Sequence, residues 1–501
     1  MRILFISRCA KFDGTSSLSN VPRLVVHRML VEDPTLNITW LVPRTVDDTQ
    51  LWKFLIAPLP EEAQKRLTFV KATGYGFDRM VGYFSTEEIW QQLNQARTDT
   101  PYDLVVTQQA PLVPAYKAVL MNRMMSSRYN TTTPWVIWHL WTATLSQMEE
   151  VPEYYMGEAD VAAELMGCYH ADLNIWESNY LLQDALRSMR KWFQPATVKK
   201  VITNSKPVHV GVEIDRMDEV FERRMERAAA GGAPELLWAS RYANQKKPRI
   251  SFEQTRKVQT ELAASGTTVG VTVSSSQPTP EWVTKDYHDW RAFENQDRDG
   301  WFNVLGLGDI VLCNSVSEGY GTTWIEMLAA GVLVVFEKSW WNEQLVPDWY
   351  PFLAETKQEQ VLMAKELARQ YPDGPLWKTY VPRVREWIRA EQSDKSSGPL
   401  MLDLLRQQFS TALQADEAIA RGSVGQLVHK AALAAVDKHG PIVTATEVFA
   451  MMSEVSDSER NWGKKGDPIS AVYLRRALQG NGWKDLGQPE LTFTREEANH
   501  G

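Results

Sequence analysis

The sequence predicts an α/β protein with two parallel-sheet domains and a small, mainly helical third domain. Short apolar runs alternate with amphipathic stretches over the first 210 residues, and a second block of this kind starts at Glu235. A helix-rich segment follows residue 424. Strands that alternate with helices are typical of a parallel sheet covered by helices. A chain of 501 residues is also too long for a single core, which favours several domains.

The expected strands are short and apolar. In the first block they are Ile3–Ser7, Ile38–Val42, Leu67–Val70, Leu104–Thr107, Trp135–His139 and Leu173–Trp176. In the second block they are Leu236–Ala239, Thr268–Val273, Ile310–Cys313 and Val332–Phe336. Small and polar residues predict a hinge at Arg223–Pro234 and a linker at Gln392–Gly398. The expected domains are therefore residues 1–225, 226–392 and 424–501, with a linker and helix at 393–423.

The composition narrows the class of protein. With 44% hydrophobic and 23% charged residues the chain resembles soluble globular proteins. It has no apolar run of 18 residues, and Met1–Ile6 is expected to be a strand rather than a signal peptide. Cys9, Cys168 and Cys313 are too far apart to predict a disulfide framework or a zinc site. A cytoplasmic protein is expected, and the net charge of −8 argues against one that coats a polyanion.

The densest functional signal is the segment Asn314–Glu326, which follows the apolar strand at Ile310. Glu318 belongs to a loop and Glu326 to the helix after it, so the two can hold opposite ends of an extended ligand. Carboxylates accept hydrogen bonds from vicinal hydroxyl groups, and glycines let a backbone approach closely. Exposed amides at Gly319–Thr323 would lie at the N-terminus of the helix, where partial positive charge favours a diphosphate.

This segment resembles the family-four type of retaining glycosyltransferases, whose two Rossmann-like domains face a cleft in the arrangement called GT-B. Their hallmark is the pattern Ser-x-x-Glu-Gly-Phe-Gly together with a second glutamate further along. Seven residues separate the two glutamates. The matching residues are Ser315, Glu318, Gly319, Tyr320 (in place of Phe), Gly321 and Glu326. The resemblance implies a nucleotide-sugar donor, with UDP-glucose as the expected type, and retained anomeric configuration. A capped helix with a solvated glutamate is the alternative, which the preceding strand and the glycines make weaker.

A second segment of the same family's pattern is Trp238–Lys246. It resembles the motif Gly-Arg-Leu-x-x-x-x-Lys, with Ser240 in place of Gly. The resemblance implies that Arg241 and Lys246 neutralise the leaving diphosphate, the kind of contact that stabilises a transition state by several kcal/mol. It further implies that Glu318 binds the sugar. The ribose would be held by Glu326, and the remaining donor contacts would come from Gly319, Tyr320, Gly321 and Thr322.

The first domain matches the family less closely. Family members carry a Gly-Gly loop after the first strand, and this chain has Phe12–Ser17 with the single glycine Gly14. The resemblance implies that Gly14 binds the donor and that Thr15 contacts a phosphate. His139 ends a strand where the family often has a histidine near the donor sugar, which implies a catalytic role. An ordinary core histidine is equally compatible with the sequence.

The expected reaction needs neither a cofactor nor an obligatory metal ion. No carboxylate is clearly placed as a nucleophile, so we expect a front-face route in which the departing diphosphate takes the acceptor's proton. Positioning and electrostatic support of the leaving group would then carry catalysis. Asp297–Asp299 has the letters of an Asp-x-Asp metal motif, but it precedes the wrong strand and is expected to be a solvated loop.

Two further segments of the sequence bear on the acceptor. The acidic stretch Met148–Glu164 argues against an anionic membrane as partner. The last segment, with expected helices Val424–Lys438, Ala445–Glu454 and Ile469–Gln479 and a strand Leu491–Thr494, resembles a winged helix-turn-helix. In that fold the third helix enters the major groove of DNA. The resemblance therefore implies that the residues in contact with DNA are Arg475, Arg476, Lys464, Lys465 and Lys484. Its nine Lys/Arg against ten Asp/Glu leave a protein-docking module as the alternative.

Together these features predict an enzyme that transfers a sugar to DNA. The acceptor would be the hydroxyl group of a modified pyrimidine, hydroxymethylcytosine or hydroxymethyluracil, as in phages that modify their genomes inside the host cytoplasm. The base would have to leave the stack. Two alternatives stay open: a glycosyltransferase for a glycan, lipid or small metabolite, and a non-catalytic regulator that binds DNA and responds to nucleotide sugars. The sequence does not predict an oligomeric state.

Overall fold

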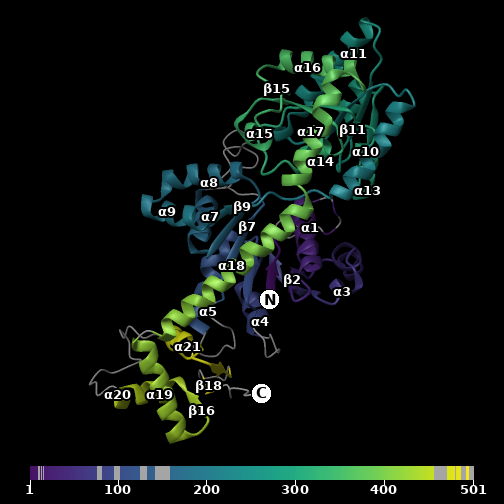
Figure 1. Cartoon of the computed structure of the whole chain (residues 1–501). Coiled ribbons are helices and arrows are strands. Elements are labelled where there is room, and N and C mark those ends of the chain that lie inside the picture. Colours follow the sequence, from purple (N-terminus) through teal and green to yellow (C-terminus); the bar gives the residue numbers. More distant parts are fainter. Residues whose placement is uncertain are drawn as a thin grey trace.

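Two parallel sheets form the cores of two domains, and a small third domain follows at the end of one long helix (Figure 1). The expected α/β class is therefore confirmed. The computed structural model describes residues 1–9, 12, 14, 16–75, 82–94, 102–123, 133–140, 158–421, 423–455, 471–479, 481–486 and 492–495.

The first domain is built on seven strands in the order β3-β2-β1-β6-β7-β8-β9, and all neighbours are parallel. The strands are β1 (Arg2–Ile6), β2 (Asn37–Pro43), β3 (Leu67–Ala72), β6 (Leu104–Thr107), β7 (Trp135–His139), β8 (Leu173–Trp176) and β9 (Ser205–Pro207). β6, β7 and β8 are buried along their whole length, which explains their continuous apolar runs. A two-stranded ribbon of β4 (Gly74–Tyr75) and β5 (Tyr83–Phe84) adjoins this domain.

Helices of the first domain follow its strands in the chain. They are α1 (Ser17–Glu32), α2 (Asp48–Leu51), η1 (Trp52–Ile56), α3 (Glu61–Gln64), α4 (Thr86–Asn94), η3 (Ala110–Leu112), α5 (Val113–Arg123), α7 (Glu158–His170), α8 (Asn179–Trp192) and α9 (Pro195–Thr203).

The second domain has six parallel strands in the order β12-β11-β10-β13-β14-β15. They are β10 (Glu235–Ala239), β11 (Gly270–Ser274), β12 (Arg291–Phe293), β13 (Ile310–Cys313), β14 (Leu333–Glu337) and β15 (Leu353–Ala354). When the strands are numbered in chain order, the sheet has the doubly wound order 3-2-1-4-5-6. The first three strands extend the sheet to one side and the last three to the other, so the switch point lies between β10 and β13. Ligands of such sheets bind outside the carboxyl ends of the strands at this switch point.

The helices of the second domain complete this pattern. They are α10 (Ile214–Ala229), η6 (Asn244–Lys246), α11 (Pro248–Ala264), α12 (Glu281–Asp286), α13 (Arg298–Leu305), α14 (Thr322–Ala329), α15 (Trp340–Leu345), α16 (Lys357–Gln370) and α17 (Pro375–Glu391).

The chain crosses between the two domains twice, and the crossings lie side by side. Val212 donates its backbone N–H to Gln392 (2.9 Å), and Asp394 donates its own to Val212 (3.0 Å). A Cβ atom on Gly211 would lie 2.2 Å from the backbone nitrogen of Asp394, so only glycine fits there. The connection between the domains is therefore these two paired segments.

The expected hinge and linker are accordingly wrong. Arg223–Pro234 contains the last two turns of α10, which continues to Ala229. Gln392–Gly398 contains the start of α18 (Asp394–Arg421). Small and polar residues predicted loops in both places, but packing of the helices against their domains overrides that composition.

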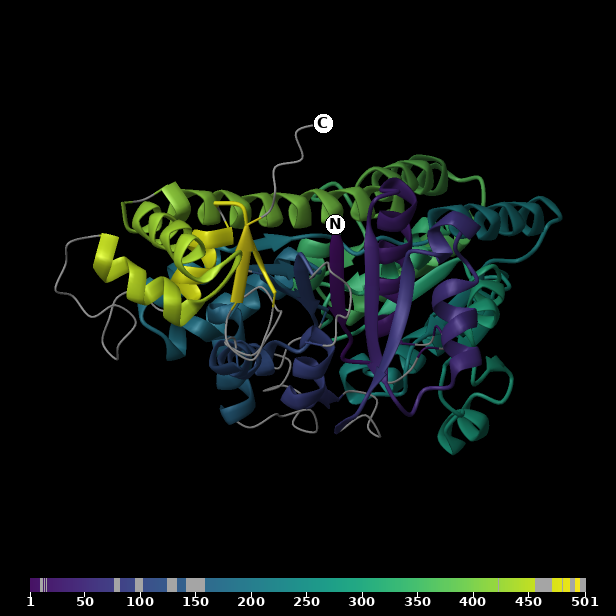
Figure 2. The ribbon, with the colours of Figure 1, turned by 90° about the horizontal axis from the view of Figure 1, so that it is seen from below.

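α18 runs from the crossing along the first domain to the C-terminal module (Figures 1 and 2). It packs against α1, and its Arg406 guanidinium pairs with Asp33 at 2.9 Å. The module contains α19 (Ser423–His439), α20 (Ala445–Val455) and α21 (Ala471–Gln479). Its antiparallel sheet has the order β16-β18-β17, with β16 (Ile442–Thr444), β17 (Trp483–Asp485) and β18 (Thr492–Arg495). The three expected helices and the last strand are thus present, and β16 and β17 are additional.

A buried arginine fastens α10 to the second sheet. Arg224 is 3% exposed and donates to the carbonyl oxygens of Gly308 and Ala330, both at 2.6 Å. Its Nη2 atom pairs with the buried Asp309 carboxylate at 2.8 Å. This side chain donates to two backbone carbonyl oxygens and shares the Asp309 carboxylate with Arg227, which satisfies polar groups that are buried between α10 and the sheet.

We expect Arg224→Met to lower the free energy of unfolding by about 3 kcal/mol, because it removes one partner from a buried ion pair. Arg223→Ala, on the exposed side of the same helix, is the control and should cost well under about 1 kcal/mol. Urea unfolding followed by circular dichroism measures both. Equal losses for the two variants would contradict the role given to Arg224.

Candidate functional site

The candidate site lies where the loops after β10 and β13 meet at the switch point of the second sheet. Val316 donates its backbone N–H to the carbonyl oxygen of Gln245 (2.9 Å), and the Gln245 side chain donates to the carbonyl oxygen of Ser317. The two loops are thereby held together. One carries the expected phosphate-binding cations, and the other carries the first expected glutamate.

Lys246 and Glu318 form a buried ion pair, and both side chains are about one-tenth exposed. The indole N–H of Trp324 donates to the same Glu318 oxygen at 3.1 Å. The structure therefore brings together two residues that lie 72 positions apart. Arg241 lies on the same loop as Lys246, is exposed, and makes no ion pair with any residue that the structure describes.

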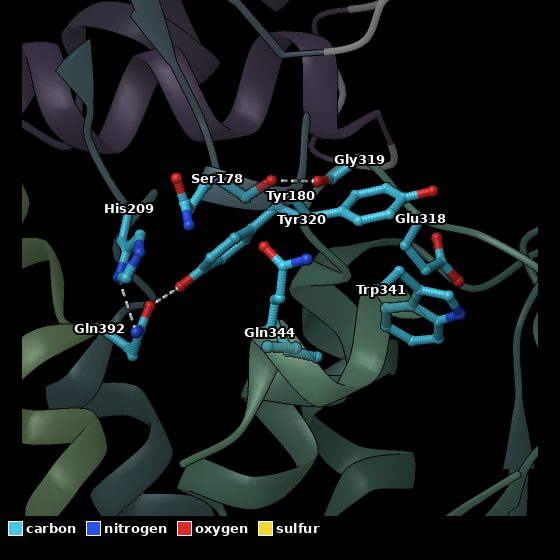
Figure 3. Close-up of a pocket in the computed structure, with 11 residues that line it drawn as sticks. Ser178, Tyr180, His209, Glu318, Gly319, Tyr320, Trp341, Gln344 and Gln392 are labelled. Atoms are coloured by element: carbon cyan, nitrogen blue, oxygen red, sulfur yellow. Dashed lines mark hydrogen bonds between the residues drawn. The ribbon is translucent and has the colours of Figure 1, made fainter. Parts of the chain in front are cut away.

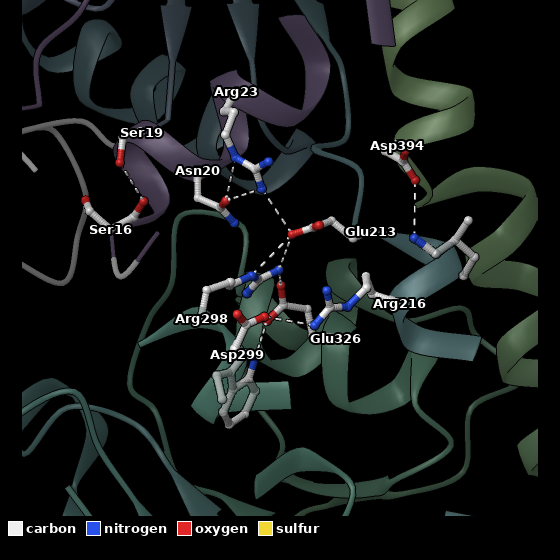
Figure 4. Close-up of polar contacts among 12 residues, drawn as sticks. Ser16, Ser19, Asn20, Arg23, Glu213, Arg216, Arg298, Asp299, Glu326 and Asp394 are labelled. Atoms are coloured by element: carbon white, nitrogen blue, oxygen red, sulfur yellow. Dashed lines mark hydrogen bonds and ion pairs between the residues drawn. The ribbon is translucent and has the colours of Figure 1, made fainter. Parts of the chain in front are cut away.

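Glu326 lies on α14 and is held at both carboxylate oxygens. Arg298 pairs with one oxygen at 2.5 Å, and the Trp301 indole N–H donates to the other at 2.8 Å. Burial lowers the pKa of Arg298, but the adjacent carboxylates of Glu326 and Glu213 raise it, and the net shift is upward. The segment Asp297–Asp299 is the capped start of α13 rather than the expected loop, although both aspartates are solvated as expected. Arg298 points into the site (Figure 4).

The first domain reaches this part of the site through Gly14. Its φ of 81° is in the left-handed region, and a Cβ atom on it would lie 3.1 Å from the Cβ of Arg298. The loop after β1 thus contacts α13 across the domain boundary. Thr15 lies outside the described residues.

A second contact between the domains lies beside Glu318. The Ser178 hydroxyl caps α8 by accepting from the Leu181 N–H (3.0 Å), and it donates to the Gly319 carbonyl oxygen at 2.6 Å. A Cβ atom on Gly319 would lie 2.1 Å from a carboxyl oxygen of Glu177. The absence of a side chain at position 319 permits this approach, which places a first-domain carboxyl group next to Glu318.

Glu177 is a candidate residue that sequence reasoning missed. Burial raises the pKa of its carboxyl group well above 4.5, and the charge of Glu318 raises it further. A carboxyl group that keeps its proton can donate a hydrogen bond to a ligand. The available signal was a glutamate directly after the buried strand β8, which has no meaning until β8 is placed opposite the loop of Glu318.

A small pocket adjoins Glu318 between the two domains (Figure 3). Tyr320 lines it, and its hydroxyl group donates to the Gln392 side chain, whose amide in turn donates to His209 Nδ1 at 2.7 Å. The Tyr320 hydroxyl group is therefore engaged in the domain junction rather than open to a donor. Gly321 caps α14 with a φ of 79°, and Thr322 begins that helix.

His139 does not belong to the site. Its ring stacks on Trp176 with centroids 3.8 Å apart, and its Nε2 lies 3.0 Å from the Asn174 side-chain oxygen. Burial lowers its pKa to about 4, so the ring is neutral at pH 7. The expected catalytic role is wrong, because the histidine side chain is enclosed in the core of the first domain.

Of the five residues expected to contact DNA, the structure describes the side chains of Arg475 and Lys484, and only Lys484 is exposed. Arg475 is 1% exposed and pairs with Asp485 on β17, so the expectation that it faces DNA is wrong. α21 also packs against α18 and α19. Lys484 is exposed. Lys464, Lys465 and the side chain of Arg476 lie outside the described residues.

Within the described ranges, no helix has both the length and the apolar character needed to span a membrane. In the same part of the chain, no group of three or more His, Cys, Asp or Glu residues could hold a metal ion.

Comparison with known proteins identifies the fold as GT-B. No protein-family model matches the sequence, and no curated protein matches it significantly. The chain is similar to HepE from Anabaena, solved with UDP and glucose (TM-score 0.55, 13% identity, 81% of this chain and 99% of that chain covered). It is also similar to the sucrose-phosphate synthase of Thermosynechococcus elongatus (TM-score 0.56, 14% identity, 82% of this chain and 99% of that chain covered). A third similar structure is the catalytic domain of starch synthase IV from Arabidopsis thaliana, bound to ADP and acarbose (TM-score 0.53, 11% identity, 82% of this chain and 99% of that chain covered).

Glu177 should make stability depend on pH. Because its folded-state pKa lies above 4.5, the folded protein retains a proton that the unfolded chain loses, so stability falls as pH rises above 4.5. Glu177→Gln removes this loss. We expect the variant's melting temperature to exceed that of the unchanged protein increasingly between about pH 5 and about pH 8, with no gain near pH 4.

Glu222→Gln, an exposed position on α10, is the matched control and should shift the melting temperature little at any pH. A difference between Glu177→Gln and the unchanged protein that does not vary with pH would contradict the protonated state of Glu177.

Proposed function

We propose that this chain is a retaining glycosyltransferase that uses a nucleotide-sugar donor of the UDP-glucose type. The observation that carries this proposal is the buried Lys246–Glu318 pair at the switch point of the second sheet, with Glu326 on the next helix. Ligands bind at this position in doubly wound sheets. The GT-B fold supports the proposal, as do the structures of HepE with UDP and with UDP-glucose.

Each charged residue then has a distinct task. Lys246 and Arg241 stabilise the negative charge that grows on the leaving diphosphate, and Glu318 accepts hydrogen bonds from the sugar hydroxyl groups. Glu326 is assigned to the ribose, and the free amides at the start of α14 to a phosphate. We propose that these groups suffice without a cofactor or an obligatory metal ion. The departing diphosphate takes the acceptor's proton as the new glycosidic bond forms on the same face of the sugar.

The ion pair prepares the site for this chemistry. Lys246 and Glu318 hold each other's orientation before the donor arrives, which reduces the reorganisation needed in the transition state. Because the pair is largely shielded from water, its charges act on a bound donor more strongly than exposed charges would.

We expect Lys246→Ala and Arg241→Ala each to lower turnover by at least about 100-fold, the usual scale for one lost electrostatic partner of a transition state. Folding should be unaffected in Arg241→Ala, whose side chain is exposed. Lys247→Ala, at the adjacent position, is the control and should retain most activity. Sugar release from a panel of sugar nucleotides measures the rates. Unchanged rates in both variants with every competent donor would exclude this phosphate site.

For the acceptor, we propose the hydroxyl group of a hydroxymethylated pyrimidine in DNA. The C-terminal module supports this through its order of elements, three helices with a three-stranded antiparallel sheet, as expected for a winged helix. The exposed Lys484 lies on the strand where a wing would follow a phosphate backbone.

A second candidate is a glycan, lipid or small-molecule acceptor with a protein-docking module. The burial of Arg475 against Asp485 favours it, because the third helix then lacks one of its two expected DNA-facing cations. Packing of α21 against α18 favours it as well.

Removal of residues 424–501 separates the two candidates. If the module binds DNA, transfer to long hydroxymethylated duplexes should fall much more than transfer to a short oligonucleotide, through lost local concentration. Binding of the complete protein to DNA should also weaken with added salt, as counterion release requires. Products are digested to nucleosides and identified by mass spectrometry. Sugar found on a glycan or lipid and never on the base would exclude the DNA acceptor.

A further inference from the structure

Arg298 lies between the two ends of the candidate donor site, although nothing in the sequence pattern assigned it a role. It begins α13 and lies against Gly14 of the first domain on one side. On the other side it pairs with Glu326 of α14. The family resemblance implies that Gly14 and Glu326 both contact the donor, Glu326 through the ribose.

Two carboxylates fix the orientation of the Arg298 guanidinium group. Nε and Nη2 donate to Glu213 at 3.2 and 3.1 Å, and Nη2 also donates to Glu326 at 2.5 Å. Nη1 makes no hydrogen bond to any residue that the structure describes. A guanidinium group has five N–H donors in a planar fork, and the two on Nη1 remain for a ligand.

The surroundings of this group strengthen its charge. The Arg298 side chain is 18% exposed, so it is shielded from most water but is not fully enclosed. A charge in such a position acts on an anion more strongly than the same charge in solvent. The planar fork of arginine also matches the oxygen geometry of a phosphate, which a lysine in its place would not.

Glu213 links this arrangement to the first domain. Its carboxylate also accepts from Arg23 of α1 at 3.2 Å, and Arg23 is held in turn by Asn20 at 2.8 Å. Arg23, Glu213, Arg298 and Glu326 therefore form one chain of alternating charges across the domain boundary (Figure 4). The two carboxylates that orient Arg298 belong to the second domain, and Arg23 joins them to the first domain through Glu213.

We propose that Arg298 is a donor-binding residue whose free Nη1 end binds a phosphate of a nucleoside diphosphate, with Glu213 and Glu326 as the groups that position it. The assignment rests on the proposed function and adds a third cation to Arg241 and Lys246. It differs from a purely structural role, in which the ion pairs would only fasten the two domains.

The test compares UDP with uridine, because the two share a base and a ribose and differ in the phosphates. We expect Arg298→Ala to weaken UDP binding at least about tenfold more than uridine binding, the usual scale for hydrogen bonds to a charged group, because loss of the pair with Glu326 affects the ribose of both ligands equally. Calorimetry, with uridine measured by displacement, gives both affinities. Arg298→Lys should recover part of the loss for UDP, since it restores the charge without the fork.

Two matched variants separate binding from structural effects. Arg216→Ala removes a nearby guanidinium group that pairs with Asp299 at 2.9 Å, and it should leave both affinities unchanged. Arg23→Ala breaks the link between the domains and leaves the Arg298–Glu326 pair intact, so it shows what loosening the junction alone does.

The possible results have distinct meanings. Equal weakening of UDP and uridine by Arg298→Ala, matching that of Arg23→Ala, would overturn the assignment and leave Arg298 a structural link. Unchanged UDP binding in Arg298→Ala would overturn it as well. Absence of binding of UDP, ADP and GDP to the unchanged protein would instead overturn the proposed function, and the assignment with it.

Discussion

The two domains come closest to each other beside Glu318, where Glu177 of the first domain lies against Gly319 of the second. A side chain at position 319 would collide with a carboxyl oxygen, and the Ser178 hydroxyl group bonds to the Gly319 carbonyl in the same place. With this spacing, the carboxyl ends of the two parallel sheets face each other. The polar residues that follow the strands are therefore gathered in one place, although neither domain contains a complete site.

Local sequence predicted most of the strands for a physical reason. A parallel strand covered on both faces must be apolar throughout, so β6, β7, β8 and β13 begin and end where the apolar runs do. Segments whose structure depends on distant contacts were not predictable in this way. α10 extends into an alanine- and glycine-rich stretch as far as Ala229, and its packing against the second domain, including the anchor at Arg224, outweighs that composition.

The same distinction applies to the site. Lys246, Glu318 and Glu326 belong to local patterns at a strand end or a helix start, and a pattern of this kind can be recognised from one stretch of sequence. Arg298 and Glu177 become meaningful only through partners on other elements, which no local pattern contains. His139 shows the converse: its strand end was correctly predicted, but whether the ring would face the core or the cleft depended on what packs beside it.

The course of α18 has a mechanical consequence. Its first residue pairs with Val212 at the crossing, and its later turns are fixed to α1 by the pair of Arg406 with Asp33. The helix and the module at its end are therefore fastened mainly to the first domain. A change in the angle between the two parallel-sheet domains would leave the distance between the C-terminal module and the first domain unchanged. A ligand bound to the module would thus keep its distance from the first-domain side of the site.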